Sequence, residues 1–213
     1  MHLKEEDAFV VRHMEPSDVK AVSELHCTGI PTGLLADLGV DVLSSLYSEI
    51  AHGDNGFVYV LIDKRKKIKG FIAGATRLDK IMRGFIIRKL FRLGFITLKL
   101  VFSKASIVRI RDNIRYSSKQ QIRVPVAELL SIVVDPSLRG TGAAELLLNA
   151  LKGEFSRQNV SAFKVMVRAD FDRANAFYQK NGFEHSQMIK KGGHLANIYV
   201  SDVLTDAMEL SSE

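Results

Sequence analysis

Cysteine and proline are scarce in this chain of 213 residues. Cys27 is the only cysteine and there are four prolines, whereas 46% of the residues are hydrophobic. One cysteine excludes an internal disulfide, and such a residue is more often a small buried hydrophobe than a catalytic thiol. Few prolines and a high apolar content argue against disorder, and the length allows a sizeable core. The composition therefore indicates a single soluble globular domain.

Metal-binding, secretory and membrane-spanning patterns are also lacking. The six histidines do not fall at metal-ligand spacing with cysteines or carboxylates, so no metal is predicted. Residues 1–11, MHLKEEDAFVV, carry charges where a secretory signal needs an apolar core. Arg88, Lys89, Arg92 and Lys99 interrupt every twenty-residue window of the segment around them, which argues against a transmembrane helix. We expect a cytoplasmic protein.

The most informative segment is 126–148, VAELLSIVVDPSLRGTGAAELLL. An apolar run of strand length, 129–134, is ended by Pro136, and 143–151 has the alanine and leucine content of a helix. Gly140 and Gly142 therefore lie just before a helix N-terminus. Unpaired backbone N–H groups and the helix dipole favour an anion there, and glycine lets the backbone approach a phosphate closely. This order predicts a phosphate-binding loop.

The loop RGTGAA resembles the acetyl-CoA loop of the GNAT N-acetyltransferases, whose pattern is Gln/Arg-x-x-Gly-x-Gly/Ala. Arg139, Gly142 and Ala144 match that pattern. A six-residue glycine pattern alone is weak evidence, because an ordinary tight turn before a helix looks the same. The loop therefore needs support from a second motif.

A second motif follows about thirty residues later, in DRANAFYQKNGF at 172–183. It resembles the family's helix with an Ala-x-x-x-Tyr-x-x-x-Gly-Phe ending, which Ala174, Tyr178, Gly182 and Phe183 match. Gly182 is placed where a left-handed helix stop is expected. Two motifs in this order and spacing extend the resemblance over residues 8 to 203, apart from one insertion.

The resemblance implies an α/β protein with the GNAT fold, a mixed central β-sheet of about seven strands flanked by helices, over a single domain of residues 1–213. The sequence pattern itself predicts strands at 8–13, 57–63, 68–77, 129–134, 161–168, 183–190 and 194–201, and helices at 15–27, 35–51, 143–158 and 172–181.

Residues 79–124 form an insertion between the third and fourth strands, where the family has a short connection. From 77 to 123 there are thirteen Lys or Arg against two Asp, a net charge of +11, so the rest of the chain carries −5 of the total of +6. Apolar side chains recur at three- and four-residue steps, which predicts two amphipathic helices. These apolar rows are Met82, Ile86, Leu90 and Leu93, and Phe91, Phe95, Leu98 and Phe102.

Four interpretations of this basic insertion stay open. It packs on the domain as a helical hairpin with a solvated basic face, or it caps the acceptor site and attracts an acidic substrate. Alternatively, residues 79–119 attach peripherally to an anionic membrane surface. Nucleic-acid binding is the weakest alternative, since no base-stacking or groove-reading motif accompanies the charge, and no nucleic acid is expected as a partner. An exposed apolar face on these helices would favour a homodimer.

The activity that the resemblance implies is acetyl transfer from acetyl-CoA to a primary amine, with acetyl-CoA as co-substrate. Glu128 lies eleven residues before Arg139, where histone-type members carry a general base, and Tyr178 stands where members often have a general acid. The implied cofactor-binding residues are Ile132, Val133, Val134, Arg139, Gly140, Thr141, Gly142, Ala143, Ala144, Asn175 and Tyr178.

Each catalytic assignment has a structural alternative. Glu128 would otherwise be a partly solvated or arginine-paired carboxylate, and Tyr178 a helix aromatic packed on the sheet. Glu24 and Asp37 are weaker substitutes for the base. Phe171 stands where the family usually has an asparagine, so one cofactor contact is missing or replaced, with Asp172 and Arg173 as candidates.

A small-molecule amine, such as a nucleotide-linked amino sugar, would suit the basic insertion as acceptor. A protein N-terminus or lysine would instead need an open peptide groove. The alternative from another class is a catalytically silent GNAT-derived module that binds CoA and docks on a membrane or protein through the insertion.

Overall fold

A seven-stranded sheet in the order β1-β2-β3-β4-β5-β7-β6 forms the centre of the molecule. The computed structural model describes residues 9–30, 39–92, 124–191 and 193–203. All neighbouring strands are antiparallel except β4 and β5, which are parallel, so the predicted mixed sheet is confirmed. The strands are β1 (Val10–His13), β2 (Gly56–Ile62), β3 (Ile68–Ala75), β4 (Glu128–Val134), β5 (Ala162–Arg168), β6 (Glu184–Lys191) and β7 (His194–Asp202).

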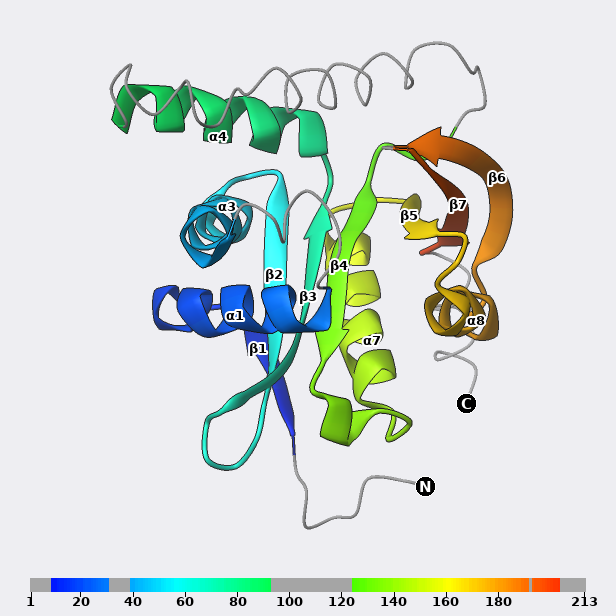
Figure 1. Cartoon of the computed structure of the whole chain (residues 1–213), viewed down its shortest axis with the longest axis horizontal. Helices are drawn as coiled ribbons and strands as arrows, with labels where there is room; N and C mark the ends of the chain where they lie inside the picture. Colours follow the sequence, from blue (N-terminus) through cyan, green and yellow to red (C-terminus); the bar gives the residue numbers. More distant parts are fainter. Residues whose placement is uncertain (1–8, 31–38, 93–123, 192, 204–213) are drawn as a thin grey trace.

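Helices cover both faces of the sheet (Figure 1). The helices are α1 (Val19–Gly29), α3 (Gly39–His52), α4 (Leu78–Arg92), α7 (Ala143–Arg157) and α8 (Asp172–Lys180), with short 3-10 turns at Pro16–Asp18 and Pro136–Leu138. One buried cluster joins α1, α3 and the start of α4 to one face, and a second joins α7 and α8 to the other. This two-sided cover explains why β2 is a continuous apolar run rather than an alternating one.

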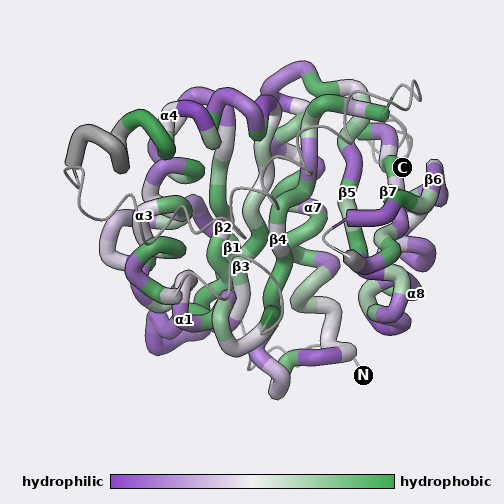
Figure 2. Tube along the Cα trace, turned by 45° about the horizontal axis from the view of Figure 1, so that its top comes forward, coloured by the Kyte–Doolittle hydropathy of each residue, from purple (hydrophilic) through white to green (hydrophobic). Residues whose placement is uncertain are grey.

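The two clusters divide the strands by side-chain parity. In β2, Val58 and Val60 face α1 and α3, whereas Phe57, Tyr59 and Leu61 face α7. Figure 2 shows hydrophobic residues concentrated along the central strands β2, β3 and β4, with hydrophilic residues more common along α4 and α8. The central strands therefore contribute to two cores, one on each face of the sheet, whereas β1 and β6 at its edges are largely exposed.

Helix α4 confirms a helix at the start of the insertion. Ile81 is buried, and Leu78, Met82 and Phe85 pack against the α1–α3 core. Ile86, which shares the predicted apolar row with Met82, is 39% exposed. The apolar side chains of this helix therefore divide between the core and the surface. The later members of the predicted rows, and the second predicted helix, lie outside the described side chains.

Candidate functional site

Strands β4 and β5 pair over only two residues and then separate. Their parallel register joins Glu128 to Lys164 and Leu129 to Val165, and no pair follows. The register between β3 and β4 shifts by one residue at Leu130, which is a β-bulge. Beyond Leu129, the β5 side of β4 therefore has no strand partner, and the two ribbons diverge there (Figure 1); we call this free edge the β4–β5 opening.

Backbone groups of β4 face this opening at alternate residues. The N–H of Asp135 donates to the carbonyl of Lys69 at 2.7 Å, which fixes the phase of the antiparallel β3–β4 ladder. Hydrogen-bonding groups in such a ladder alternate in direction, so those of Ser131 and Val133 face β3. Those of Ile132 and Val134 face the opening. An extended ligand could therefore bond to the free edge of β4.

The predicted phosphate loop lies at the far end of β4. Gly140 and Gly142 have φ of 75° and 91°, a left-handed conformation that glycine adopts without strain. Gly142 caps α7. The first backbone N–H of α7 that donates a hydrogen bond is that of Leu146, which donates to the Gly142 carbonyl at 3.0 Å. The N–H groups of residues 143–145 have no acceptor in the described chain, and no atom lies within 4 Å of a Cβ built at Gly140 or Gly142. Such a cradle fits a phosphate group.

Internal hydrogen bonds hold the loop in this shape. Asp135 accepts from the Ser137 N–H at 2.9 Å and hydroxyl at 2.6 Å, and from Lys69 at 3.2 Å. The Ser137 bonds, with Lys69, lower the pKa of Asp135 to about 2. The Thr141 hydroxyl donates to the Leu138 carbonyl at 2.7 Å, so this predicted ligand-binding side chain shapes the loop. The exposed Arg139 guanidinium makes no ion pair within the described chain.

Glu128 begins β4 on the α1–α3 face of the sheet, opposite to its neighbours Ala127 and Leu129. Its Oε2 lies 3.9 Å from Nζ of Lys164, which also donates to the Pro125 carbonyl at 2.6 Å. Burial raises the pKa of Glu128, and the positive charges of Lys164 and Lys191 oppose that rise. Glu128 is therefore a desolvated carboxylate with a more basic character than one in water.

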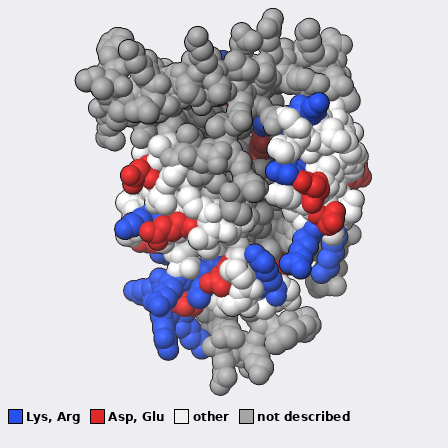
Figure 3. All heavy atoms as spheres, viewed as in Figure 1, with Lys and Arg blue, Asp and Glu red and all other residues white. Residues whose placement is uncertain are grey.

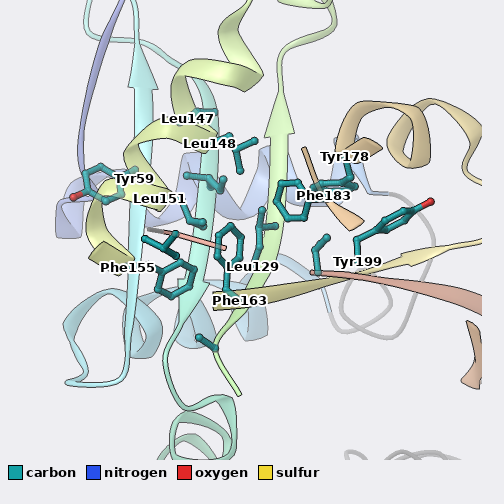
Figure 4. Close-up of a cluster of buried hydrophobic side chains, with 14 of the residues drawn as sticks. Tyr59, Leu129, Leu147, Leu148, Leu151, Phe155, Phe163, Tyr178, Phe183 and Tyr199 are labelled. Carbon is teal, nitrogen blue, oxygen red and sulfur yellow. The ribbon is translucent and has the colours of Figure 1, made fainter. Parts of the chain in front are cut away.

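Tyr178 lies on the other face of the sheet, in the α7 cluster. Its ring packs edge-on against Phe183, with centroids 5.1 Å apart, and is stacked on Tyr199 at 6.2 Å (Figure 4). The phenol makes no hydrogen bond to any residue that the structure describes. Burial raises its pKa, so the hydroxyl keeps its proton at neutral pH.

Asn175 is engaged by the protein itself. Its Nδ2 donates to the carbonyls of Arg168 at 2.9 Å and Phe171 at 2.8 Å, and its Oδ1 accepts from Asn197 and Tyr199. These bonds fix the start of α8 against β5 and β7. The predicted contact of Asn175 with the cofactor stays a prediction, and it would require exchanging one of these bonds.

Phe171 caps α8, and its ring lies 4.8 Å from the Arg168 guanidinium. Asp172 and Arg173, the candidates to replace the missing asparagine, are both exposed. The substitute base Glu24 is exposed on α1 and pairs weakly with Lys20 at 3.9 Å. Asp37 lies outside the described residues. Among the described residues, the charged side chains that act on Glu128 are instead Lys164 and Lys191.

Sequence reasoning missed one buried polar group near β4. Nδ1 of His26 lies 2.6 Å from the Tyr47 hydroxyl. Burial raises the pKa of Tyr47, and Ser131 opposes that rise. These three residues come from α1, α3 and β4 and are all buried. No spacing in the sequence brings them together. The only signal is that each is a polar residue within an otherwise apolar helix face or strand.

The described residues contain neither a metal-binding cluster nor a helix that could cross a membrane. No group of three His, Cys, Asp or Glu side chains there could hold a metal ion. None of the described helices has the length and apolar content that crossing a bilayer requires.

Residues 105–199 match the family model of the GNAT acetyltransferase domain. Solved structures share the fold over most of the chain. The ribosomal-protein-S18-alanine N-acetyltransferase from Escherichia coli is 16% identical, with 92% of this chain and 94% of that chain covered and a TM-score of 0.57. Mutant forms of the spermidine/spermine N-acetyltransferase SpeG from Vibrio cholerae are also 16% identical, with 96% of this chain and 98% of that chain covered and a TM-score of 0.58.

Arabidopsis thaliana NAA60 in complex with acetyl-CoA is also similar, at 18% identity, with 92% of this chain and 98% of that chain covered and a TM-score of 0.59. The matched segment includes the glycine loop and α8. The chain therefore has the GNAT fold, and residues 105–199 match the GNAT acetyltransferase domain.

Proposed function

We propose that the protein transfers an acetyl group from acetyl-CoA to a primary amine, by direct attack in a ternary complex. The observation that carries this proposal is the continuity of the opening beside β4 with the glycine cradle at its far end. An anion held by the amides of residues 143–145 would leave an attached extended arm free to lie along Ile132 and Val134. This geometry suits a phosphate-bearing thioester.

The reaction needs a neutral amine. An alkylamine has a pKa of about 10.4, so removing its proton at pH 7 costs about 4–5 kcal/mol. Glu128, whose pKa burial raises, would take this proton from an acceptor on the α1–α3 face. The amine nitrogen then bonds to the thioester carbonyl carbon, and the carbon–sulfur bond breaks.

Two further groups would stabilise the charges that this step creates. The backbone N–H of Ile132 faces the opening and can donate to the carbonyl oxygen as it becomes negative. Tyr178, protonated and without a protein hydrogen-bond partner among the described residues, can donate to the departing thiolate. The products are the N-acetylated amine and the free thiol of CoA.

Local charge favours an anionic small-molecule acceptor, such as a nucleotide-linked amino sugar. Lys164 and Lys191 both act on the Glu128 carboxylate, and the hairpin end that carries Lys191 reaches the start of β4 (Figure 1). The basic insertion also leaves the sheet after β3 and returns just before β4, since Ala75 pairs with Glu128. On the same face, basic side chains gather over the β2–β3 turn and are interleaved with acidic ones around β5–β7 (Figure 3).

Thiol release with matched acceptors tests this proposal. Glucosamine, glucosamine 6-phosphate, a nucleotide-linked amino sugar and spermidine would be compared at equal concentration. We expect the highest kcat/KM with the phosphate-bearing amines, and a Lys191→Gln variant should lose that preference. Highest activity with spermidine would contradict the anionic acceptor while leaving acetyl transfer intact. In the cytoplasm, where we propose that the protein works, acetyl-CoA would be available.

A silent CoA-binding module is the second candidate. The observation that favours it is on α4, where Ile86 and Ile87 are 39% and 53% exposed beside Arg83, which suits contact with an anionic membrane surface. In a vesicle flotation assay, this candidate predicts binding to phosphatidylserine-containing vesicles that an Ile86→Ser, Ile87→Ser variant loses. Acetylation of any amine, at a rate that rises with the amine concentration, would contradict a module without catalytic activity.

A further inference from the structure

Phe171 is the only exposed phenylalanine or tyrosine in the part of the chain that the structure describes, at 38% exposure. The other described phenylalanine and tyrosine rings are buried or half-buried. A single apolar side chain on a surface means little by itself. Phe171 differs from such a side chain because its neighbours hold the ring in one place.

Arg168 supports one side of the Phe171 ring. Its guanidinium carbon lies 4.8 Å from the ring centroid, which is a cation–π contact. The guanidinium is itself held by Asp170, with Nε donating to Oδ1 at 2.9 Å and Nη2 donating to Oδ2 at 2.5 Å. Two parallel bonds of this kind fix the plane of a guanidinium group. The exposed part of the ring therefore lies away from Arg168, where a second flat group can stack on it.

The start of α8 does not depend on the Phe171 ring. The Phe171 carbonyl accepts from the Asn175 N–H at 2.9 Å and from Nδ2 of Asn175 at 2.8 Å, and the Phe171 N–H donates to the Arg168 carbonyl at 3.1 Å. These are main-chain groups of Phe171, and every residue except proline carries both of them. The phenyl group is therefore not needed to build the helix and is available to a ligand.

The ring and the glycine cradle lie at the same end of the β4–β5 opening. Strands β4 and β5 are parallel, so their carboxyl ends share one edge of the sheet. The cradle follows β4 and begins α7, whereas Phe171 follows β5 and begins α8, and both helices contribute to the same buried cluster (Figure 1). Ligands of open sheets bind in the crevice outside the carboxyl ends of such strands. A ligand anchored in the cradle therefore has Phe171 across the opening from it.

We propose that Phe171, supported by Arg168, is a stacking platform for the adenine ring of acetyl-CoA. The inference rests on the proposed function for the identity of the ligand. With a phosphate in the cradle and the thioester arm along β4, the covalent order of the molecule leaves the nucleotide outside the strand ends. Stacking on an aromatic ring suits a purine, because every base has a flat π-face. Phe171 would set the affinity for acetyl-CoA and take no part in acetyl transfer.

Binding of two thioesters to Phe171→Ala tests the platform. Acetyl-CoA carries the adenosine, whereas S-acetyl-4′-phosphopantetheine ends at the first phosphate. Alanine in place of a ring under a stacked base lowers affinity by about 5- to 150-fold. We expect the Kd of acetyl-CoA, measured by calorimetry, to rise by that factor, whereas the Kd of the shorter thioester keeps its wild-type value. Phe171→Tyr, which retains a ring, should bind both thioesters as the wild type does.

Turnover gives a second measurement of the same effect. Phe171→Ala should raise the KM for acetyl-CoA and leave kcat at saturating acetyl-CoA unchanged, because a remote binding contact acts equally on the ground state and the transition state. Met188→Ala is the matched control, since Met188 is 50% exposed on β6 and the substitution also removes an exposed apolar side chain. This control should keep the wild-type Kd for both thioesters.

Three results would overturn the platform. These are an unchanged Kd of acetyl-CoA in Phe171→Ala, equal losses of affinity for the two thioesters, and a rise in KM confined to a nucleotide-linked acceptor. The last result would show that the ring binds the acceptor instead. If the wild type binds acetyl-CoA but acetylates no amine, the proposed function fails, whereas the two affinities still test the platform.

Discussion

At the scale of single side chains, Glu128 carries the proposed proton transfer. Removing its charge in Glu128→Gln should lower kcat by 10²–10³-fold, because a general base contributes about 10²–10⁴-fold. Acetyl-CoA affinity should not change, since the cradle lies at the other end of β4. Steady-state kinetics and calorimetric binding check both expectations. Glu24→Gln, on the exposed face of α1, is the control and should keep wild-type kcat.

The pH dependence of turnover reports on the same carboxyl group. Burial raises the pKa of Glu128 above its ordinary value of 4.5, and only the deprotonated form accepts a proton. The value of kcat/KM should therefore rise tenfold per pH unit below that raised pKa, and level off above it as far as this group is concerned. A pH profile measured with Glu128→Gln should lack this limb. A limb that persists in the variant would assign it to another group.

Tyr178 allows a cleaner substitution than most buried tyrosines. Its hydroxyl makes no hydrogen bond in the described chain, so Tyr178→Phe removes no protein contact and should leave the melting temperature within about 1 °C. Turnover should fall by about 10- to 100-fold through loss of the thiolate donor. Tyr199→Phe, which breaks a bond to Asn175 of 3.1 Å, is the opposite control and should lower stability more than turnover. Unchanged turnover in Tyr178→Phe would show that this side chain packs in the core and takes no part in catalysis.

At the scale of elements, the glycine loop depends on a backbone conformation. Gly142 has φ of 91°, so Gly142→Ala should lower the free energy of unfolding by about 1–2 kcal/mol. It should also weaken acetyl-CoA binding, because the added Cβ enters the open space at the cradle. Gly153→Ala is the matched control within α7, an exposed helical site that should gain about 0.5–1 kcal/mol. Denaturant unfolding measures the two stabilities and calorimetry the two affinities; unchanged acetyl-CoA affinity in Gly142→Ala would contradict the cradle account.

The far end of α7 is tied to β2 by Glu154. Burial disfavours its charge, but hydrogen bonds from Arg157, Gln158 and Tyr59 outweigh this and lower the pKa to about 2. The resulting stability is present above the unfolded pKa near 4.5 and is lost as pH falls toward 2. Glu154→Gln should therefore be less stable than wild type by about 1–2 kcal/mol at pH 7, with the difference vanishing near pH 2. Exposed Glu184→Gln should show no such pH-dependent difference in denaturant unfolding.

Element positions followed well from local pattern. Strands and helices beside the glycine loop were predicted to within one or two residues, because apolar runs and proline or glycine stops mark them. In helix α4, periodicity predicted the apolar row but not how much of it packs on the core, which depends on where the helix crosses α1 and α3. The bulge at Leu130 has no signal in one sequence, because it depends on the register with β3.

At the scale of the whole molecule, motif and spacing predicted the glycine loop before α7 and proposed Glu128 and Tyr178 as catalytic residues. That these two residues lie on opposite faces of the sheet follows from the side-chain alternation along β4 and from the face on which α8 packs, which needs the tertiary structure. The hydrogen bond between His26 and Tyr47 joins two helices, which no local pattern can reveal.

Acetyl-CoA-dependent thiol release, followed across amino sugars, their phosphates and nucleotide conjugates, polyamines, amino acids and peptides, tests the central claim most directly. Wild type would be run beside Glu128→Gln and Tyr178→Phe. The account predicts turnover with one acceptor class, greatest for phosphate-bearing amines, and loss of turnover in both variants with acetyl-CoA still bound. Tight binding of acetyl-CoA without thiol release from any amine would contradict an acetyltransferase.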